Sequence, residues 1–411
     1  MINTLQQSIS KIRLGAARAA LTLLVVLAFA LVTTRPAQAQ TFTVLFTFNG
    51  TDGATPLAGL VRDAKGNFYG TTWGPDPGTV FKVDANNGTE TVLMAFDGNY
   101  EGGRPYATLV RDDAGALYGT AQLGGSAGNG VVFKLSNDHR VTILHNFIGG
   151  SSDGALPTGS LIRDQAGNFY GTTYQGGSAN NGVVFKLTPR SNGRWKETVL
   201  HSFTGADGAN PVYSSLLMDE KGNFYGVTSQ GGAYGGGVVF KLTLGSNGRW
   251  QQTVLHSFAG GTTDGCFPFG TPVMDKEGNL YGTTEQCGGA YNGGIVWKLS
   301  PKGTETVLHT FVGGYSDGLN PFAGGVLDSA GNLYGTTVYG GNGSGCGTET
   351  SCGIVYKLNQ KGTLTVLYRF TGSSDGEQPT GSLMLDAKGN LYGTAEGNSE
   401  TYFGSVWKLT P

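Results

Sequence analysis

The sequence predicts an all-β protein, a seven-bladed β-propeller with four antiparallel strands in each blade. Glycine makes up 71 of the 411 residues, as expected of a chain with many tight turns. No part of the repeat has helical periodicity, and a repeat of about 50 residues with several short strands is typical of a propeller blade. A Tyr-Gly-Thr or Tyr-Gly-Val stretch occurs seven times at intervals of 49 to 58 residues, beginning at Tyr69, Tyr118, Tyr170, Tyr225, Tyr281, Tyr334 and Tyr392.

Residues 196–250 represent one repeat. Short stretches of alternating residues rich in β-formers predict its strands at 198–203, 215–219, 224–228 and 238–242. The hairpin turn at 219–223 joins the second and third of these strands, with Asp219 capping the turn through its side chain and Gly222 in the left-handed conformation. A glycine-rich loop at 231–237 leads to the fourth strand. Such a blade is apolar on both faces, so it must stack on neighbours.

The two ends of the chain indicate how the ring closes. A strand of the 198–203 type opens the chain at 43–48, and a strand of the 238–242 type ends it at 406–409. If the first type is the outermost strand of each blade, the opening strand completes the last blade. The N-terminal strand then pairs into the last blade and closes the ring without an open edge.

Residues 1–39 have the pattern of a signal peptide. Lys11, Arg13 and Arg18 precede a 14-residue stretch at 19–32 that is apolar except for Thr22, and Ala37-Gln38-Ala39 is a small-residue cleavage site. An uncleaved anchor is the alternative. We expect cleavage to leave one propeller domain at 40–411, without a membrane span because no other apolar stretch approaches 18 residues.

The charge of the chain argues against two classes of partner. Residues 1–39 hold four basic residues and no acidic ones, so their removal changes the net charge from −2 to −6. A mildly acidic chain without a basic run argues against binding to nucleic acid or to anionic membrane surfaces. We expect a monomer that is secreted or held at the cell surface, with a periplasmic location as the alternative.

The repeat resembles a known family. The stretch Gly-[Asn/Ala]-[Leu/Phe]-Tyr-Gly-[Thr/Val], a Gly-Gly loop and then Gly-[Val/Ile]-Val-[Phe/Trp/Tyr]-Lys-Leu are similar to the Gloeo/Verruco (GloVer) repeats of exported bacterial proteins. The resemblance covers residues 41–411. It implies an exported, surface-associated repeat protein with no assigned molecular role. The strand order also resembles that of NHL-type propellers, which implies no active site here.

Residues that recur in every repeat are expected to serve the blade. Aspartates in the Asp-x-x-Gly turns are read as turn caps, with a metal or catalytic pair as the alternative. A second acidic residue stands four positions before a proline in each repeat, and it is also assigned to turn chemistry. These residues are Asp52, Glu101, Asp153, Asp207, Asp264, Asp317 and Asp375.

Four of the histidines, His145, His201, His256 and His309, share one repeat position with Phe46, Met94 and Tyr368, which indicates a packing position. No hydrolase, metalloprotease or nucleotide-binding motif occurs, so no cofactor, metal or catalytic residue is predicted.

Four cysteines in an exported chain are expected to be oxidised. Cys266 and Cys287 belong to loops of the same repeat that emerge on one face of the ring, and Cys346 and Cys352 share one inserted loop. We therefore expect the disulfides Cys266–Cys287 and Cys346–Cys352. Neither spacing suits a zinc site with four thiolates.

Function is expected where the repeats differ. The loops between the third and fourth strands carry aromatic residues amid Gly, Asn, Gln and Ser: Trp73, Tyr174, Tyr234, Tyr291, Tyr339 and Tyr402. Aromatic rings beside amide and hydroxyl groups are suited to binding a sugar or a protein surface, and packing within the loops is the alternative. Arginine precedes the turn aspartate in the first three repeats alone and is a weak anion-site candidate, at Arg62, Arg111 and Arg163.

Three functional hypotheses remain open. The first is a binding module whose loop-rich face recognises an extracellular polysaccharide or surface protein. The second is a propeller enzyme, a lyase or glycan hydrolase, for which the loop residues Glu285, Glu396 and Glu400 would have to meet near the channel. The third is a structural component of the cell envelope.

Overall fold

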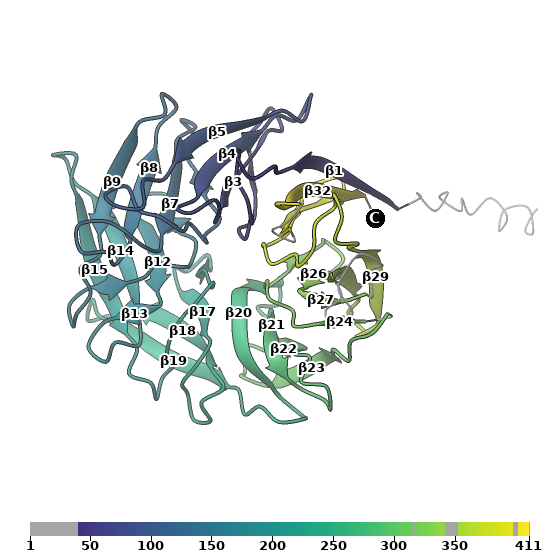
Figure 1. The fold of residues 1–411 in the computed structure, drawn as a ribbon. Coiled ribbons are helices and arrows are strands. Elements are labelled where there is room, and N and C mark those ends of the chain that lie inside the picture. The colour runs from purple at the N-terminus through teal and green to yellow at the C-terminus, as the bar shows by residue number, and fades with distance from the viewer. Residues whose placement is uncertain (1–39, 316, 342–351, 398–401, 411) are drawn as a thin grey trace, which may run out of the picture. The chain divides into compact units, whose positions relative to one another are not determined.

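The computed structural model describes residues 40–315, 317–341, 352–397 and 402–410. Residues 42–410 form a compact unit in which seven four-stranded antiparallel sheets make a propeller (Figure 1). The predicted fold class is therefore confirmed. In the described part of the chain, no helix has the length and apolar character needed to cross a membrane.

The strands of each blade are given from the centre of the ring outward. The first blade contains β2 (Val61–Arg62), β3 (Phe68–Thr72), β4 (Thr79–Val83) and β5 (Glu90–Ala95), and the second contains β6 (Val110–Arg111), β7 (Leu117–Ala121), β8 (Val131–Leu135) and β9 (Val141–Asn146). The third blade contains β11 (Ile162–Arg163), β12 (Phe169–Thr173), β14 (Val183–Pro189) and β15 (Trp195–Ser202). The fourth contains β16 (Leu217–Met218), β17 (Phe224–Thr228), β18 (Val238–Leu244) and β19 (Trp250–Ser257). The fifth blade contains β20 (Gly265–Met274), β21 (Leu280–Cys287), β22 (Ile295–Leu299) and β23 (Glu305–Thr310). The sixth contains β25 (Val326–Leu327), β26 (Leu333–Thr337), β28 (Ile354–Leu358) and β29 (Leu364–Arg369). The seventh contains β30 (Met384–Leu385), β31 (Leu391–Ala395), β32 (Ser405–Thr410) and, as its outermost strand, β1 (Thr41–Thr47).

Two short pairs of strands lie beside the blades. β10 (Gly154–Ala155) pairs with β13 (Gln175–Gly176), and β24 (Gly318–Leu319) pairs with β27 (Tyr339–Gly340). Each pair joins the segment that enters a blade to the loop that follows the Tyr-Gly strand. These pairs were not predicted.

The glycine of the Tyr-Gly stretch makes room for an aromatic side chain of the same blade. Gly226 on β17 pairs with Phe240 on β18, and a Cβ atom at Gly226 would lie 2.7 Å from the ring of Phe240. Phe240 is fully buried between blades. A larger residue at position 226 would have to displace this ring, so the recurrence of the glycine has a packing cause.

The hydrophobic core lies between neighbouring blades. One of its seven clusters joins Tyr170 and Val184 of the third blade to Leu216, Phe224 and Phe240 of the fourth. Because each blade is covered on both faces, its two middle strands are buried along most of their length, as in β3 and β4. A single blade would expose these faces to water, which explains why the repeats are stable only as a stack.

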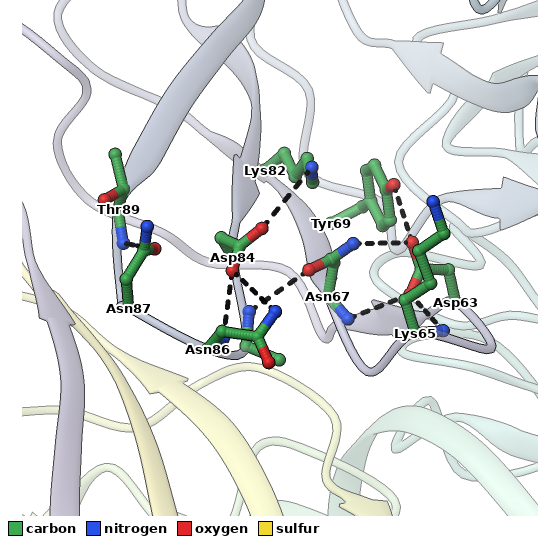
Figure 2. A network of polar contacts seen from close by, with 10 residues as sticks. Asp63, Lys65, Asn67, Tyr69, Lys82, Asp84, Asn86, Asn87 and Thr89 are labelled. Atoms are coloured by element: carbon green, nitrogen blue, oxygen red, sulfur yellow. Dashed lines mark hydrogen bonds and ion pairs between the residues drawn. The ribbon is translucent and has the colours of Figure 1, made fainter.

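The Asp-x-x-Gly turns are held by the aspartate side chain, as predicted. Figure 2 shows Asp63, whose Oδ1 accepts hydrogen bonds from the backbone N–H groups of Lys65 and Asn67, both at 2.9 Å. Its Oδ2 accepts from the Asn67 amide at 2.9 Å and from the Tyr69 hydroxyl at 3.0 Å. The carboxylate thus ties the turn to the first residues of the next strand.

The ring closes through the N-terminal strand, as predicted. β1 pairs with β32 as the outermost strand of the seventh blade (Figure 1). The ring of Phe42 on β1 stacks on Tyr368 with centroids 3.6 Å apart. Nearer the centre, the Thr394 hydroxyl of the seventh blade donates to the carbonyl of Ala58 at 2.8 Å. The Phe42 contact therefore holds β1 against the sixth blade, and the Thr394 bond joins the seventh blade to the segment that leads into the first.

Candidate functional site

A cavity of about 220 Å³ lies at the centre of the ring and is lined by residues from all seven blades. Its wall comes from the segments that lead into the innermost strands and from the ends of the Tyr-Gly strands. Both kinds of segment lie on the face that carries the glycine-rich loops. A second hollow, of about 460 Å³, adjoins the cavity and shares Tyr213 and Glu285 with it.

One repeat position, six residues before each turn aspartate, faces the centre of the ring. It is occupied by Leu57, Tyr106, Thr158, Tyr213, Phe269, Phe322 and Thr380. Four of these residues are aromatic, and their rings contact one another at the central cavity. The ring centroid of Tyr213 lies 5.1 Å from that of Tyr106 and 5.2 Å from that of Phe322. The ring centroids of Phe269 and Phe322 are 4.9 Å apart. These half-buried rings form an aromatic cluster at the centre of the propeller.

Hydroxyl side chains two residues further on hold the entering segments in place. The Gly59 N–H donates to Thr108 Oγ1 at 3.0 Å, and the Thr108 N–H donates to Ser160 Oγ at 2.9 Å. The series continues from Ser160 N–H to Ser215 Oγ at 3.0 Å and from Ser215 N–H to Thr271 Oγ1 at 3.1 Å. Each bond joins one blade to the next, so the lining of the cavity is rigidly placed.

A second variable position, four residues after each Tyr-Gly tyrosine, surrounds the mouth of the cavity. It is occupied by Trp73, Gln122, Tyr174, Ser229, Glu285, Val338 and Glu396. Glu285 and Glu396 line the central cavity, whereas Gln122, Tyr174 and Ser229 line the adjoining hollow together with Glu285. The mouth therefore combines two carboxyl groups with amide, hydroxyl and aromatic side chains.

The two carboxyl groups of the cavity bind protons more tightly than exposed ones. Burial raises the pKa of Glu396 to about 7, and the nearby charge of Glu377 adds to the rise. The Thr380 hydroxyl donates to Glu396 Oε1 at 3.2 Å, which partly opposes it. Burial also raises the pKa of Glu285. Such groups can donate a hydrogen bond when protonated and accept one when charged.

The structure separates the predicted binding aromatics into three groups. Tyr174 and Tyr339 line the hollow and the cavity, respectively. Tyr234 and Tyr291 are each 68% exposed on loops and line neither space. The third group, Trp73 and Tyr402, is half-buried. The guanidinium of Arg104 lies over the Trp73 ring, 5.0 Å from its centroid. The six residues therefore do not form one surface.

The three candidate arginines lie away from the cavity. Arg62 stacks over Phe68 and Tyr392 at 5.2 and 5.3 Å and is 3.8 Å from Asp386. Arg111 lies over the Tyr69 ring at 5.8 Å, and the side chain of Arg163 is exposed. Two of the three thus pack across the boundary between blades, where their charge contacts aromatic faces.

One expected disulfide is present. Cys266 and Cys287 are joined, with Cα atoms 5.3 Å apart, at the ends of β20 and β21. Cys346 lies outside the described residues, and so does the Cys346–Cys352 pairing. No cysteine of the described ranges is free. Of the three glutamates considered for catalysis, Glu400 also lies outside the described residues.

The repeated histidines have a polar role that the sequence did not reveal. Each packs edge-on against a phenylalanine, as a packing position requires, for example His201 against Phe203. Each Nε2 also faces the acidic residue of the following turn, at 3.2 Å in His145–Asp153 and 3.0 Å in His201–Asp207. The interpretation as a packing position alone is therefore corrected. Phe46 and Met94 occupy the same repeat position and cannot form this contact, which hid the pairing in the sequence.

The four aromatic residues of the central cluster were also missed by the sequence analysis. Three of them lie in the short segments between the repeated proline and the innermost strand, and Phe269 lies within β20 itself. None lies in the loops where aromatic residues were sought. An alignment of the seven repeats would have revealed them, since this position varies among Leu, Thr, Tyr and Phe while the next position holds only Ala, Gly or Ser. Its direction toward the centre follows only from the ring.

Comparisons with solved structures agree with the fold. An ancestral GH74 enzyme matches with a TM-score of 0.55 and 12% identity, over 87% of this chain and 48% of that one. PorZ, an essential bacterial surface component of the type-IX secretion system of Porphyromonas gingivalis, matches with a TM-score of 0.51 and 13% identity, over 89% and 48%. Puromycin hydrolase matches with a TM-score of 0.51 and 12% identity, over 86% and 51%. The chain spans about half the length of these proteins, and the likeness is one of fold.

Comparison at the level of sequence gives a more specific result. No curated protein matches the chain significantly. The model of the Gloeobacter/Verrucomicrobia repeat matches residues 30–216 and 212–411, which together cover all seven blades. The chain therefore belongs to the Gloeobacter/Verrucomicrobia repeat family.

Proposed function

We propose that the protein is a saccharide-binding module whose site is the central cavity and its mouth. The observation that carries the proposal is the composition of the cavity wall, where Tyr106, Tyr213 and Phe322 lie beside Glu285 and Glu396. Aromatic faces match the C–H faces of sugar rings, and carboxyl and amide groups bind sugar hydroxyls.

The size and charge of the site narrow the ligand. A cavity of about 220 Å³ is smaller than the roughly 300–1,000 Å³ of typical ligand pockets, so it suits one sugar unit. The adjoining hollow, with Tyr174, Gln122 and Gln230, would then contact further units of a chain. Two carboxyl groups in the wall disfavour an anionic ligand. We therefore expect a neutral oligosaccharide.

The test is binding of neutral oligosaccharides, screened on a glycan array and measured by titration calorimetry. Tyr106→Ala and Tyr174→Ala are each expected to weaken binding about tenfold, because a lost stacking contact costs roughly 1–1.5 kcal/mol. The exposed pair Tyr234→Ala/Tyr291→Ala is the matched control and should bind like wild type. Loss of binding in the control with retention in the other two variants would refute the location.

A second candidate function is hydrolysis of the bound glycan. It is favoured by the presence of Glu285 and Glu396 in one cavity and by the pKa of Glu396, which is raised to about 7. A carboxylic acid that is still protonated near neutral pH can protonate a leaving group, while the second carboxylate acts as base or nucleophile. Reducing-end release from glycans that bind on the array tests this. Glu285→Gln and Glu396→Gln should each abolish release while leaving binding measurable; binding without release in wild type would exclude it.

We also propose that the chain is exported, with cleavage after Ala39. The support is the basic, apolar and small-residue order of residues 1–39. Sequencing the N-terminus of protein recovered from the medium, the periplasm and the cell surface would identify both the cleavage site and the location. Recovery of the full-length chain in the cytoplasm would contradict the proposal.

A further inference from the structure

The seams between blades contain a cluster of side chains that the saccharide site does not use. At the boundary of the fourth and fifth blades, His256 on β19, Asp264 in the following turn and Glu305 on β23 bring one ligand atom each to within 4.8 Å of one another. In the described ranges, they are the one group of three His, Cys, Asp or Glu side chains that meets in this way.

This seam differs from its counterparts in the other blades. The distance from His256 Nε2 to Asp264 Oδ2 is 3.5 Å, against 3.0–3.2 Å for the other three His–Asp pairs. A second carboxylate oxygen, Glu305 Oε2, lies 3.8 Å from the same Nε2. Among the described residues, the buried His256 Nε2 has no hydrogen-bond partner, unlike Nε2 of the other three repeated histidines. The buried Glu305 Oε1 also has none, a property that it shares with Glu90 Oε1 and Glu197 Oε1. The imidazole thus points between two carboxylates without a hydrogen bond to either.

We propose that His256, Asp264 and Glu305 bind a zinc-class divalent cation that joins the fourth and fifth blades. One neutral imidazole and two carboxylates neutralise the charge of such an ion, and an imidazole ligand favours zinc over calcium or magnesium. In a tetrahedral site with metal–ligand bonds of about 2.0 Å, neighbouring ligand atoms are about 3.3 Å apart. The distances of 3.5 and 3.8 Å need only a small contraction to reach this value.

The surroundings of the cluster hold the ligands in place. Asp264 accepts backbone N–H bonds from Ala259 and Gly265, both at 2.7 Å, which orient its carboxylate. Cys266, two residues later, is tied to Cys287 by the disulfide. His256 packs edge-on against Phe258 at 4.7 Å. The side chains of His256 and Glu305 are 19% and 17% exposed, so an ion and its remaining water ligands can enter from solvent.

The residues at the position equivalent to Glu305 differ between the blades. Gln252 occupies this position in the fourth blade and donates to the Asp207 carbonyl at 3.0 Å, and Leu364 occupies it in the sixth. Glutamate recurs at this position in the first and third blades, as Glu90 and Glu197. A divalent ion bound at the seam of the fourth and fifth blades would neutralise the charges of Asp264 and Glu305 together.

The repeats themselves supply variants that should fold. Glu305→Gln copies the residue that the fourth blade has at this position, and His256→Tyr copies Tyr368, whose hydroxyl donates to Asp375 at 2.9 Å. Glu197→Gln is the matched control, because Glu197 holds the equivalent position in the third blade, beside His145 and Asp153. Thermal unfolding of each variant without metal checks that the propeller is intact.

The experiment uses the full chain after treatment with a chelator and removal of the chelator, with disulfides oxidised. Zinc chloride is titrated by calorimetry, and cobalt(II) is added separately to record the visible absorption of a metal bound by nitrogen and oxygen. Wild type and Glu197→Gln are expected to bind one zinc ion per chain and to unfold at a higher temperature when zinc is present. Glu305→Gln should bind at least about tenfold more weakly, and His256→Tyr should show no saturable binding. Absence of binding by wild type at millimolar zinc, or binding that both variants retain, would overturn the proposal.

Discussion

At the scale of single residues, carboxyl groups in this protein titrate in opposite directions according to their surroundings. Burial by itself raises the pKa of Asp219, but hydrogen bonds from the Asn223 side chain and backbone, and from Tyr225, outweigh it and lower the pKa. Glu396 has one hydroxyl donor, so burial prevails and its pKa rises to about 7. The turn aspartates are therefore structural charges, whereas Glu396 is a group that can change its charge near neutral pH.

The raised pKa of Glu396 predicts a pH-dependent contribution to stability. The folded state binds this proton more tightly than the unfolded state, in which the carboxyl has an ordinary pKa of 4.5. The stabilisation is complete below pH 4.5 and is lost as the pH rises through about 7, and a shift of this size corresponds to roughly 3 kcal/mol. Wild type should lose that much more stability than Glu396→Gln between pH 4.5 and 7.5, measured by urea unfolding. Parallel profiles of the two proteins would show that Glu396 has an ordinary pKa.

At the scale of elements, the fifth blade departs from the common pattern. Its two inner strands, β20 and β21, have ten and eight residues, whereas the corresponding β16 and β17 have two and five. The extension brings Gly265 opposite Cys287 and Cys266 opposite Gln286, so the disulfide closes the open end of a long hairpin. The same hairpin supplies Phe269 and Glu285 to the channel mouth. Its rigidity therefore matters to the candidate site.

Removal of this disulfide should destabilise the protein without changing its fold. The bridge closes a loop with a sequence separation of 21 residues, for which about 3 kcal/mol of stabilisation is expected. Cys266→Ser/Cys287→Ser should accordingly unfold at a lower urea concentration and keep the circular dichroism spectrum of wild type. Peptide mapping of unreduced protein provides the control, and it also tests the Cys346–Cys352 pair. A free thiol at Cys266 or Cys287 would contradict the assignment.

At the scale of the whole molecule, stability depends on closure of the ring. Seven similar sheets each cover a face of the next, and β1 supplies the last outer strand from the far end of the sequence. Phe42 of β1 contacts Tyr368, Phe370 and Trp407, and Phe370 and Trp407 belong to the buried core. Without β1, the edge of β32 and these aromatic faces would be open to solvent or to another chain.

Deletion of residues 40–48 should therefore lower the unfolding temperature and cause association through β32. Phe42→Ala is the milder variant and should cost about 2 kcal/mol, because it removes an aromatic contact of a partly buried side chain. Thr43→Ala, at an exposed position of the same strand, should behave like wild type. Light scattering after size-exclusion chromatography measures the association, and calorimetry measures the unfolding. A monomeric deletion variant with unchanged unfolding would show that β1 does not contribute to closure.

Much of the fold could be predicted because each blade is encoded locally and repeated seven times. The Tyr-Gly glycine and the turn aspartate recur with their partners in the same blade, as Gly226 does with Phe240 and Asp63 with Asn67. Strand limits were less accurate: β15 begins at Trp195, three residues before the expected start, and β16 is reduced to two residues. These limits depend on the neighbouring strand and on the next blade, which a single repeat does not contain.

The candidate sites could be predicted only in part. Glu285 and Glu396 were considered because they vary between repeats, and the structure places both in one cavity. Tyr106, Tyr213, Phe269 and Phe322 were missed, since they come from four different blades and meet only across the channel. The pairing of histidine with aspartate was missed because the apolar residues Phe46 and Met94 occupy the histidine position in two of the repeats.

The amino-acid order alone determined the number of blades, the four strands in each and the way in which the ends of the chain meet, since these follow from short-range pattern and from its repetition. Tertiary structure decided which side chains share the central cavity and which share the seams between blades. Residues about 50 positions apart become neighbours there by rotation about the ring axis, and the direction in which each side chain points depends on the curvature of the assembled ring. Local patterns contain no information about that curvature, so the candidate sites became visible only in the closed propeller.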